Sequence, residues 1–142
     1  MRVLVTGAAG FIGSNLCELL LSRGDEVVGI DNFDPYYAPD IKRANLAELS
    51  ALPNSAQFTF VELDIRNERG VNDLFSTRKF DAVAHLAGMA GVRYSVDKAV
   101  LYNDVNVTGT LRLLDAARDH GLPGSFVFAS TSSVYGNTSQ IR

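Results

Sequence analysis

Three glycines near the start of the sequence have a spacing that suits the binding of phosphate groups. Gly7, Gly10 and Gly13 form a G-x-x-G-x-x-G pattern directly after an apolar Val-Leu-Val run. The first glycine would let the chain turn sharply, the second would let a pyrophosphate approach the backbone, and the third would let a helix pack closely on a sheet. The N–H groups of Phe11 and Ile12 would then face the phosphates. This context favours dinucleotide binding over a merely structural turn.

An acidic residue ends the next apolar run. Asp31 follows Val-Val-Gly-Ile, roughly 20 residues after the glycine turn, where a carboxylate can accept hydrogen bonds from the adenosine ribose hydroxyls. Its negative charge would repel a 2′-phosphate, so the sequence favours NAD over NADP. Asn32 would add a hydrogen bond. The alternative is a solvated acid at the start of a loop.

Further candidate residues follow the next two apolar runs, where a parallel sheet would bring them to the same edge. Asp64 could accept a hydrogen bond from the adenine amino group while Ile65 packs on the ring, although Asp64 could instead cap the helix that follows. Leu86, Ala87 and Gly88 would let the backbone pass close to a ribose of the cofactor. We therefore expect all five residues to contact the dinucleotide.

Two nearby residues need separate interpretations. His85 has no sequence neighbours that suggest a catalytic triad or a metal site, so a buried and hydrogen-bonded core histidine is the better interpretation, and no metal site is predicted. Asn106 lies inside a predicted helix and is soon followed by Gly109, which is locally unfavourable. Such conflicts often mark functional or closely packed positions. We expect Asn106 to hydrogen-bond loop backbone and to brace the nicotinamide end of the cofactor.

Short apolar runs alternate with segments of helical periodicity along the whole chain. The predicted strands cover residues 3–6, 26–30, 58–61, 82–85 and 125–129, and the predicted helices cover residues 11–22, 40–49, 68–77 and 98–120. Asn67 is a plausible N-cap of the third helix. Because the runs are mostly not alternating, they predict strands buried on both faces. We therefore expect an α/β doubly wound parallel sheet of order 3-2-1-4-5, with its ligand crevice at the carboxyl ends of the strands.

Composition excludes several classes of protein. With 142 residues, 46% hydrophobic and 20% charged, the chain suits one globular domain spanning residues 1–142. Its net charge of −3 and lack of a basic run argue against a nucleic-acid partner. No apolar run is long enough to span a membrane, and no signal peptide precedes the first strand. The single cysteine, Cys17, fits a reducing cytoplasm.

Taken together, these motifs resemble the extended short-chain dehydrogenase/reductases, which include NAD-dependent sugar-nucleotide epimerases and dehydratases. The resemblance is carried by residues 6–13, Asp31, residues 64–65, residues 85–88, Asn106 and residues 129–136. Residues 31–37 and 90–95 look most like the UDP-glucuronate 4-epimerase branch. The resemblance implies that a hydride is removed from and returned to C4 of a UDP-glucuronate or UDP-galacturonate type substrate, with NAD as the cofactor.

The resemblance also implies roles for residues outside the cofactor site. Thr131 matches the hydroxyl residue that shares the substrate hydroxyl with the catalytic tyrosine, and Ser132 would contact the substrate. Arg93 could clamp a substrate carboxylate or phosphate, or could equally be a surface cation. Related dehydratases carry Asp-Glu after the threonine, whereas this chain has Ser132 and Ser133. Without an acid of suitable pKa to assist elimination, an epimerase is favoured over a dehydratase.

The catalytic Tyr-x-x-x-Lys pair of the family is expected to be absent, because Tyr135 is followed four residues later by Ser139. We expect this pair, the last strands and the substrate domain to lie beyond Arg142, so the chain alone should be inactive. The alternatives are a dehydratase or decarboxylase of the same family, or a non-catalytic NAD-binding module. The family resemblance also implies a homodimer formed through the fourth predicted helix.

Overall fold

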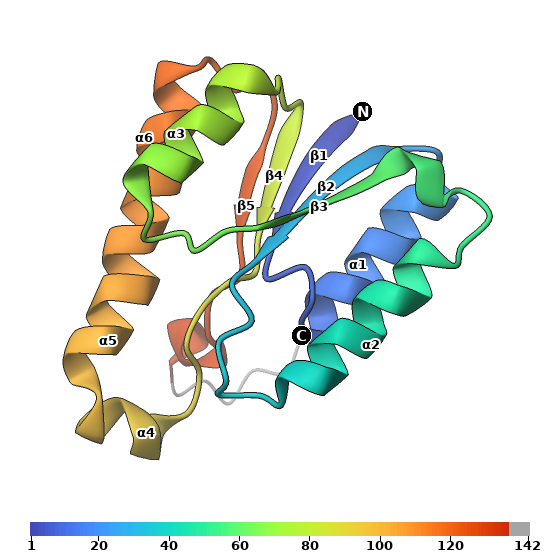
Figure 1. The fold of residues 1–142 in the computed structure, drawn as a ribbon. Coiled ribbons are helices and arrows are strands. Elements are labelled where there is room, and N and C mark those ends of the chain that lie inside the picture. Colours follow the sequence, from blue (N-terminus) through green and yellow to red (C-terminus); the bar gives the residue numbers. More distant parts are fainter. Residues whose placement is uncertain (137–142) are drawn as a thin grey trace.

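Five parallel strands form the centre of the fold, and helices cover both faces of the sheet (Figure 1). The computed structural model describes residues 1–136. The strands are β1 (Arg2–Thr6), β2 (Glu26–Asp31), β3 (Phe58–Glu62), β4 (Ala82–His85) and β5 (Phe126–Phe128), in the order β3-β2-β1-β4-β5. The predicted doubly wound Rossmann-type sheet and its strand order are therefore confirmed.

Helices α1 (Phe11–Ser22) and α2 (Pro39–Ser50) lie on one face of the sheet, and α3 (Glu68–Thr77) and α6 (Thr110–Asp119) lie on the other (Figure 1). Successive strand residues point to opposite faces. Val3, Val5 and Val27 consequently pack toward α1 and α2, whereas Leu4 and Val28 belong to the core beneath α3 and α6. Burial on both faces explains why the central strands read as continuous apolar runs rather than alternating ones.

Most predicted boundaries match within a residue or two. The helices expected at residues 11–22 and 68–77 have those bounds, and α2 is one residue longer at each end than expected. Asn67 caps α3 as predicted, because its side chain accepts a hydrogen bond of 3.0 Å from the Gly70 N–H. The fifth strand is shorter than expected, since only Phe126–Phe128 pairs with β4. A short 3₁₀ turn, η1 (Ser55–Gln57), precedes β3.

The predicted helix over residues 98–120 is wrong in detail. Two short helices, α4 (Val92–Asp97) and α5 (Ala99–Asn103), are separated at Lys98, whose φ and ψ of −125° and 37° are not helical. A π-helical segment, η2 (Asp104–Gly109), then joins α5 to α6. A π turn changes the phase of the helix, which a search for a 3.6-residue period does not anticipate. It brings Gly109 against Ile65, where an added Cβ would lie 2.7 Å from the Ile65 side chain.

Within the described residues, no helix has both the length and the apolar character needed to cross a membrane.

Substituting Gly13 tests the closest contact in the fold. A Cβ at position 13 would overlap the backbone carbonyl of Gly7, which cannot move aside as the end of a flexible side chain could. We expect Gly13→Ala to lower the free energy of unfolding by about 3 kcal/mol, the upper end for overpacking, despite the better helix propensity of alanine. Urea denaturation followed by circular dichroism would measure the loss.

Asn15→Ala is the matched control on the same helix. Asn15 is exposed, and its side chain donates only to the Phe11 carbonyl. Its replacement should change the free energy of unfolding by less than about 0.5 kcal/mol, as is usual at the surface. Equal losses for the two variants would contradict the proposed role of the Gly13 contact.

Candidate functional site

A cavity of about 550 Å³ lies at the carboxyl ends of the strands. This is the place where open parallel sheets bind their ligands. The segments that follow β1, β2, β3 and β4 all contribute to its wall. The predicted cofactor residues that line it are Gly7, Gly10, Phe11, Ile12, Gly13, Asp31, Asn32, Asp64, Ile65, Leu86, Ala87 and Gly88. The structure therefore brings together twelve residues that the sequence places on four separate segments.

The glycine turn leaves the start of α1 open toward this cavity. Gly7 has a φ of +71°, and the Gly10 N–H donates to its carbonyl over 3.0 Å. Gly10 is the N-cap of α1, and no side chain caps the helix or places a negative charge in its first turn. Hydrogen bonds along the helix begin at the Ser14 N–H. In the described part of the chain, the N–H groups of the first turn are thus left for an anion.

Asp31 does not stand alone at the end of β2. Its Oδ1 atom lies 3.1 Å from Nζ of Lys42 on α2 and accepts a hydrogen bond of 2.9 Å from the Phe33 N–H. Its Oδ2 atom accepts a longer bond of 3.3 Å from the Ala9 N–H. Both members of the ion pair are buried and both line the cavity. Oδ2 therefore keeps the remaining acceptor capacity, but the charge of Asp31 is balanced by Lys42.

Lys42 is a site residue that was not predicted, and no local signal in the sequence identifies it. Its position in α2 resembles that of any lysine on a solvated helix, and only the packing of α2 beside β2 brings it to Asp31. Asn45, one turn later on the same helix, donates to the Ala9 carbonyl over 2.8 Å and also lines the cavity. The carboxylate that is expected to repel a 2′-phosphate therefore has a cation beside it.

Asp64 has a cation of its own. Arg66 bonds to it through Nη2 at 2.6 Å and through Nε, while Asn32 donates to Oδ2 over 2.9 Å. These hydrogen bonds, those from Arg66 above all, lower the pKa of Asp64 to about 2. Asp64 does not cap α3, because Asn67 does, so that alternative interpretation is wrong. Ile65 is buried beside it and lines the cavity.

His85 is a buried core histidine, as predicted. Its Nδ1 atom lies 2.7 Å from Oγ1 of Thr6, and its Nε2 atom lies 2.9 Å from Oγ1 of Thr110. Burial lowers the pKa of His85 to about 4, so the ring is neutral near pH 7. Thr6 in turn accepts hydrogen bonds from the N–H groups of Leu86 and Ala87, which line the cavity.

Asn106 supports the cavity wall from behind rather than lining it. Its side chain accepts from the Met89 N–H over 2.7 Å and donates to the Met89 carbonyl over 2.9 Å. Met89 is one of the lining residues. The predicted hydrogen bonding of Asn106 to loop backbone is therefore confirmed. Its location in the π-helical segment η2 accounts for the locally unfavourable sequence.

The residues expected to contact substrate are not assembled in the described cavity. Thr131, Ser132 and Arg93 are exposed, and none of them lines it. Thr131 instead caps the 3₁₀ turn η3 (Ser132–Tyr135), where it accepts from the Ser133 N–H over 3.2 Å. Ser139, which the sequence places four residues after Tyr135, lies outside the described residues.

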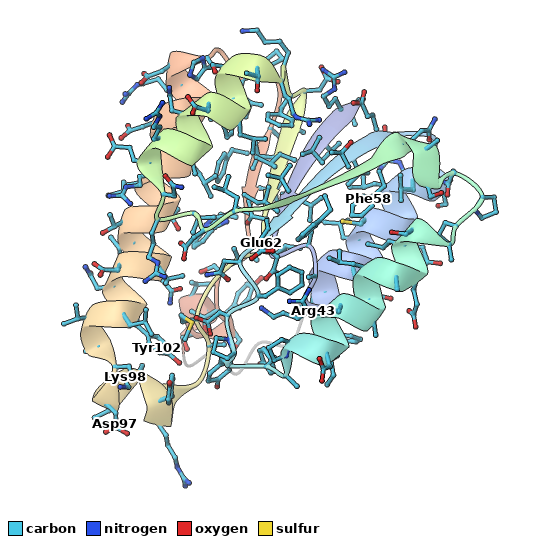
Figure 2. The ribbon with its side chains drawn as sticks, viewed as in Figure 1. Arg43, Phe58, Glu62, Asp97, Lys98 and Tyr102 are labelled. Atoms are coloured by element: carbon cyan, nitrogen blue, oxygen red, sulfur yellow. The ribbon has the colours of Figure 1, made fainter. Side chains whose placement is uncertain are left out.

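The Tyr-x-x-x-Lys spacing does occur once, at Tyr94 and Lys98, whereas the absence of the catalytic pair of the family stays a prediction. Lys98 marks the junction of α4 and α5, with Tyr102 further along α5 (Figure 2). The ring of Tyr94 packs 5.4 Å from that of Tyr36 and 6.2 Å from that of Tyr102. Neither Tyr94 nor Lys98 lines the cavity. The structure therefore places Tyr94 among other tyrosine rings and leaves Lys98 exposed.

Arg43 also packs on the β2–α2 connection. Its guanidinium lies 4.7 Å from the centre of the Phe33 ring, and the Phe33 ring lies 5.5 Å from that of Phe60 on β3. This cation–π contact holds α2, which carries Lys42, against the loop after Asp31. Among the residues that the structure describes, no group of three or more metal-ligating side chains is found.

Comparison with known proteins places this site in a family. Residues 4–142 match the protein family described as GDP-mannose 4,6 dehydratase. The chain is 43% identical over 136 residues to UDP-glucuronate 4-epimerase of Thermodesulfobacterium geofontis, covering 96% of this chain and 41% of that protein. It is also 43% identical over 141 residues to a UDP-glucose 4-epimerase of Klebsiella pneumoniae, covering 99% of this chain and 96% of that protein.

Solved structures show the same relationship. A UDP-glucuronic acid 4-epimerase from Bacillus cereus, in complex with UDP-glucuronic acid and NAD, matches with a TM-score of 0.82 and 39% identity over 99% of this chain and 43% of that one. A UDP-glucose 4-epimerase from Stenotrophomonas maltophila with bound NAD matches with a TM-score of 0.84 and 34% identity, over 99% of this chain and 40% of that one. The chain thus spans about two fifths of the length of most of these relatives. It belongs to the GDP-mannose 4,6 dehydratase family, within the sugar-nucleotide epimerases and dehydratases of the extended short-chain dehydrogenase/reductases.

Proposed function

We propose that this chain binds NAD in the cavity at the carboxyl ends of its strands, as the cofactor-binding part of a nucleotide-sugar 4-epimerase. The observation that supports the proposal is that three features line the same cavity. These are the open N-terminus of α1, the Asp31–Lys42 pair, and the wall formed by Asp64 and Ile65. Relatives of solved structure are described with NAD bound.

The cavity residues fit the parts of NAD in order. The pyrophosphate suits the first turn of α1, where N–H groups and the helix dipole favour an anion. The adenosine ribose suits Oδ2 of Asp31, with the Lys42 ammonium as a further donor. The adenine suits the Asp64 carboxylate and the Ile65 side chain. The nicotinamide ribose suits residues 86–88, behind which Asn106 holds Met89.

When bound, NAD supplies an acceptor and donor of hydride for C4 of a nucleotide sugar. The residues of this chain would bind and orient it and exclude water. We propose a UDP-glucuronate type substrate, because two relatives have that name and because residues 31–37 and 90–95 resemble that branch. Thr131 and Ser132 would contact the substrate, and Arg93 would pair with its carboxylate. Ser132 and Ser133 offer no acid for dehydration, which supports epimerisation. We place the protein in the cytoplasm.

Cofactor preference tests the role of Asp31. The chain has no tryptophan, so the fluorescence of bound NADH is easily measured. We expect NADH to bind more tightly than NADPH. Asp31→Ser should weaken NADH binding about tenfold to hundredfold, since hydrogen bonds to a charged group are lost. It should also raise the relative affinity for NADPH, because Lys42 would then be unpaired and could contact a 2′-phosphate.

Asp40→Ser is the matched control, since it makes the same change of charge on the exposed start of α2 outside the cavity. It should leave both affinities unchanged. The proposal would be wrong if the folded wild-type chain bound neither NADH nor NAD+, or if both variants shifted the NADH to NADPH ratio equally.

Turnover tests whether this chain carries the whole reaction. We propose that it does not, because Thr131 and the Tyr94–Lys98 pair do not line the cavity. Loss of acid–base groups alone would slow the reaction by about 10²–10⁴-fold. The chain incubated with NAD+ and UDP-glucuronate should give no C4 epimer above an enzyme-free blank, while a full-length UDP-glucuronate 4-epimerase run beside it should. Accumulation of UDP-galacturonate would refute this.

We also propose that a second copy of the chain covers the outer face of α5, η2 and α6. Val100, Val107, Leu111 and Leu114 are all exposed there, and a stripe of this kind favours association. Sedimentation velocity should show a concentration-dependent dimer. Leu111→Glu should abolish it, whereas Leu19→Glu, at an exposed leucine of α1, should not. A clean wild-type monomer at high concentration would rule the dimer out.

A further inference from the structure

A continuous chain of hydrogen bonds passes through His85 and connects three segments of the cavity wall. It begins at the N–H groups of Leu86 and Ala87, which reach Oγ1 of Thr6 over 3.2 and 3.0 Å. Thr6 immediately precedes the glycine turn, and its Oγ1 atom lies 2.7 Å from Nδ1 of His85. The chain continues from Nε2 of His85 to Thr110 over 2.9 Å.

The far end of the chain determines where the imidazole proton lies. Oγ1 of Thr110 is 2.7 Å from the backbone carbonyl oxygen of Asn106. Two oxygens at that separation need a hydrogen between them, and the Thr110 hydroxyl is the only one of the two groups that has one. Since that hydrogen points at Asn106, Thr110 can only accept from His85. The proton of the neutral ring must therefore be on Nε2.

The hydrogen bond at the other ring nitrogen, Nδ1, is consistent with this assignment. Nδ1 carries a lone pair, so the Thr6 hydroxyl donates to it. The two lone pairs of the Thr6 oxygen accept the N–H groups of Leu86 and Ala87. Every donor in the chain thus has an acceptor, and the Leu86 N–H is shared between Oγ1 and the backbone carbonyl oxygen of Thr6. If a second proton bound at Nδ1, Thr6 would face three donors and its own hydrogen would have no acceptor.

We propose that His85, neutral and protonated on Nε2, is a positioning residue for the cofactor cavity. It joins the end of β4 to the glycine turn through Thr6 and to the π-helical segment η2 through Thr110. From η2, the side chain of Asn106 returns to Met89 in the cavity wall. His85 thus fixes the spacing between the wall of residues 86–89 and the start of α1. This role in binding rests on the proposed function, whereas the proton assignment does not.

The surroundings of His85 favour the neutral ring. The rings of Phe126 and Phe128 pack against it with centroids 6.0 and 5.4 Å away, and its polar neighbours are the hydroxyls of Thr6 and Thr110. Burial alone lowers its pKa, with no contribution from a charged group. The fold therefore opposes both the exchange of the ring proton with solvent and the binding of a second proton to the ring.

Nitrogen NMR of the histidine rings tests the assignment on the wild-type chain. The sequence has two histidines, and His120→Gln, at the C-terminal cap of α6, identifies their signals because it leaves only those of His85. We expect Nε2 of His85 to be protonated and Nδ1 to be unprotonated, unchanged between about pH 5.5 and pH 8, as the low pKa requires. A proton on Nδ1, a mixture of tautomers, or titration near the pKa of a free histidine would overturn the proposal.

Two variants of Thr110 test the positioning role without altering the ring. Thr110→Ser keeps the hydroxyl, whereas Thr110→Val removes it and leaves Nε2–H of His85 without its acceptor. We expect Thr110→Val to accelerate hydrogen exchange at the Ala87 amide, whose acceptor is Oγ1 of Thr6, and to weaken NADH binding about tenfold, and Thr110→Ser to keep both close to wild type. Equal amide exchange in the two variants would refute the positioning role.

Failure of this inference and failure of the proposed function give different results. If the wild-type chain does not bind NADH, the function fails, while the ring NMR and the amide exchange still decide the hydrogen-bond chain. If NADH binds and His85 titrates or changes tautomer, the inference fails and the function stands. His120→Gln should leave NADH binding unchanged in either case, because His120 lies outside the cavity.

Discussion

The close approach of two backbones, at Gly13 and Gly7, is the constraint on which the rest of the site depends. No side chain fits between the first turn of α1 and the carbonyl of Gly7, so the helix starts directly above the end of β1. That placement directs the unpaired N–H groups of the helix into the crevice between the segments that follow β1 and β4. Gly7 also lies close to the segment that follows β4, because a Cβ at position 7 would lie 2.9 Å from the Ala87 nitrogen.

The electrostatics of the cavity follow from this arrangement. Both acidic side chains that the sequence singles out have a cation beside them, Lys42 for Asp31 and Arg66 for Asp64. The wall is therefore close to neutral at both positions, and the carboxylates act as hydrogen-bond acceptors rather than as net charges. The field that favours an anion comes from the backbone of α1, whose first turn contains no acid. This separation of an anion-binding helix end from two neutral acid–cation pairs suits a dinucleotide, because its pyrophosphate is charged and its riboses are not.

Local patterns in the sequence were enough to predict the parts of this site that depend on neighbouring residues. The glycine turn, Asp31 at the end of β2 and the Asn67 cap each involve a strand or helix terminus and a few residues around it. Lys42 could not be predicted, because its partner Asp31 is brought to it by the packing of α2 on the sheet. The partner of Asn106 depends on the π-helical segment, which shifts the helix by part of a turn. The helix α4 was missed, and α5 was predicted as the start of one long helix that includes η2 and α6, because no strong breaker residue marks where α5 ends.

The two halves of the cavity differ in how firmly the fold supports them. The half around α1, Asp31 and Ile65 rests on β1, β2 and β3 and on helices packed against both faces. The other half rests on β4 and on β5, a three-residue edge strand whose Phe128 is 51% exposed. That ring stacks on His85, so the burial that keeps His85 neutral depends on the least covered strand of the sheet. A short strand with few buried contacts opens more readily than a well-buried one. The hydrogen bonds through Thr6 and Thr110 therefore matter most where packing is thinnest, since they connect the end of β4 to the well-packed elements on either side.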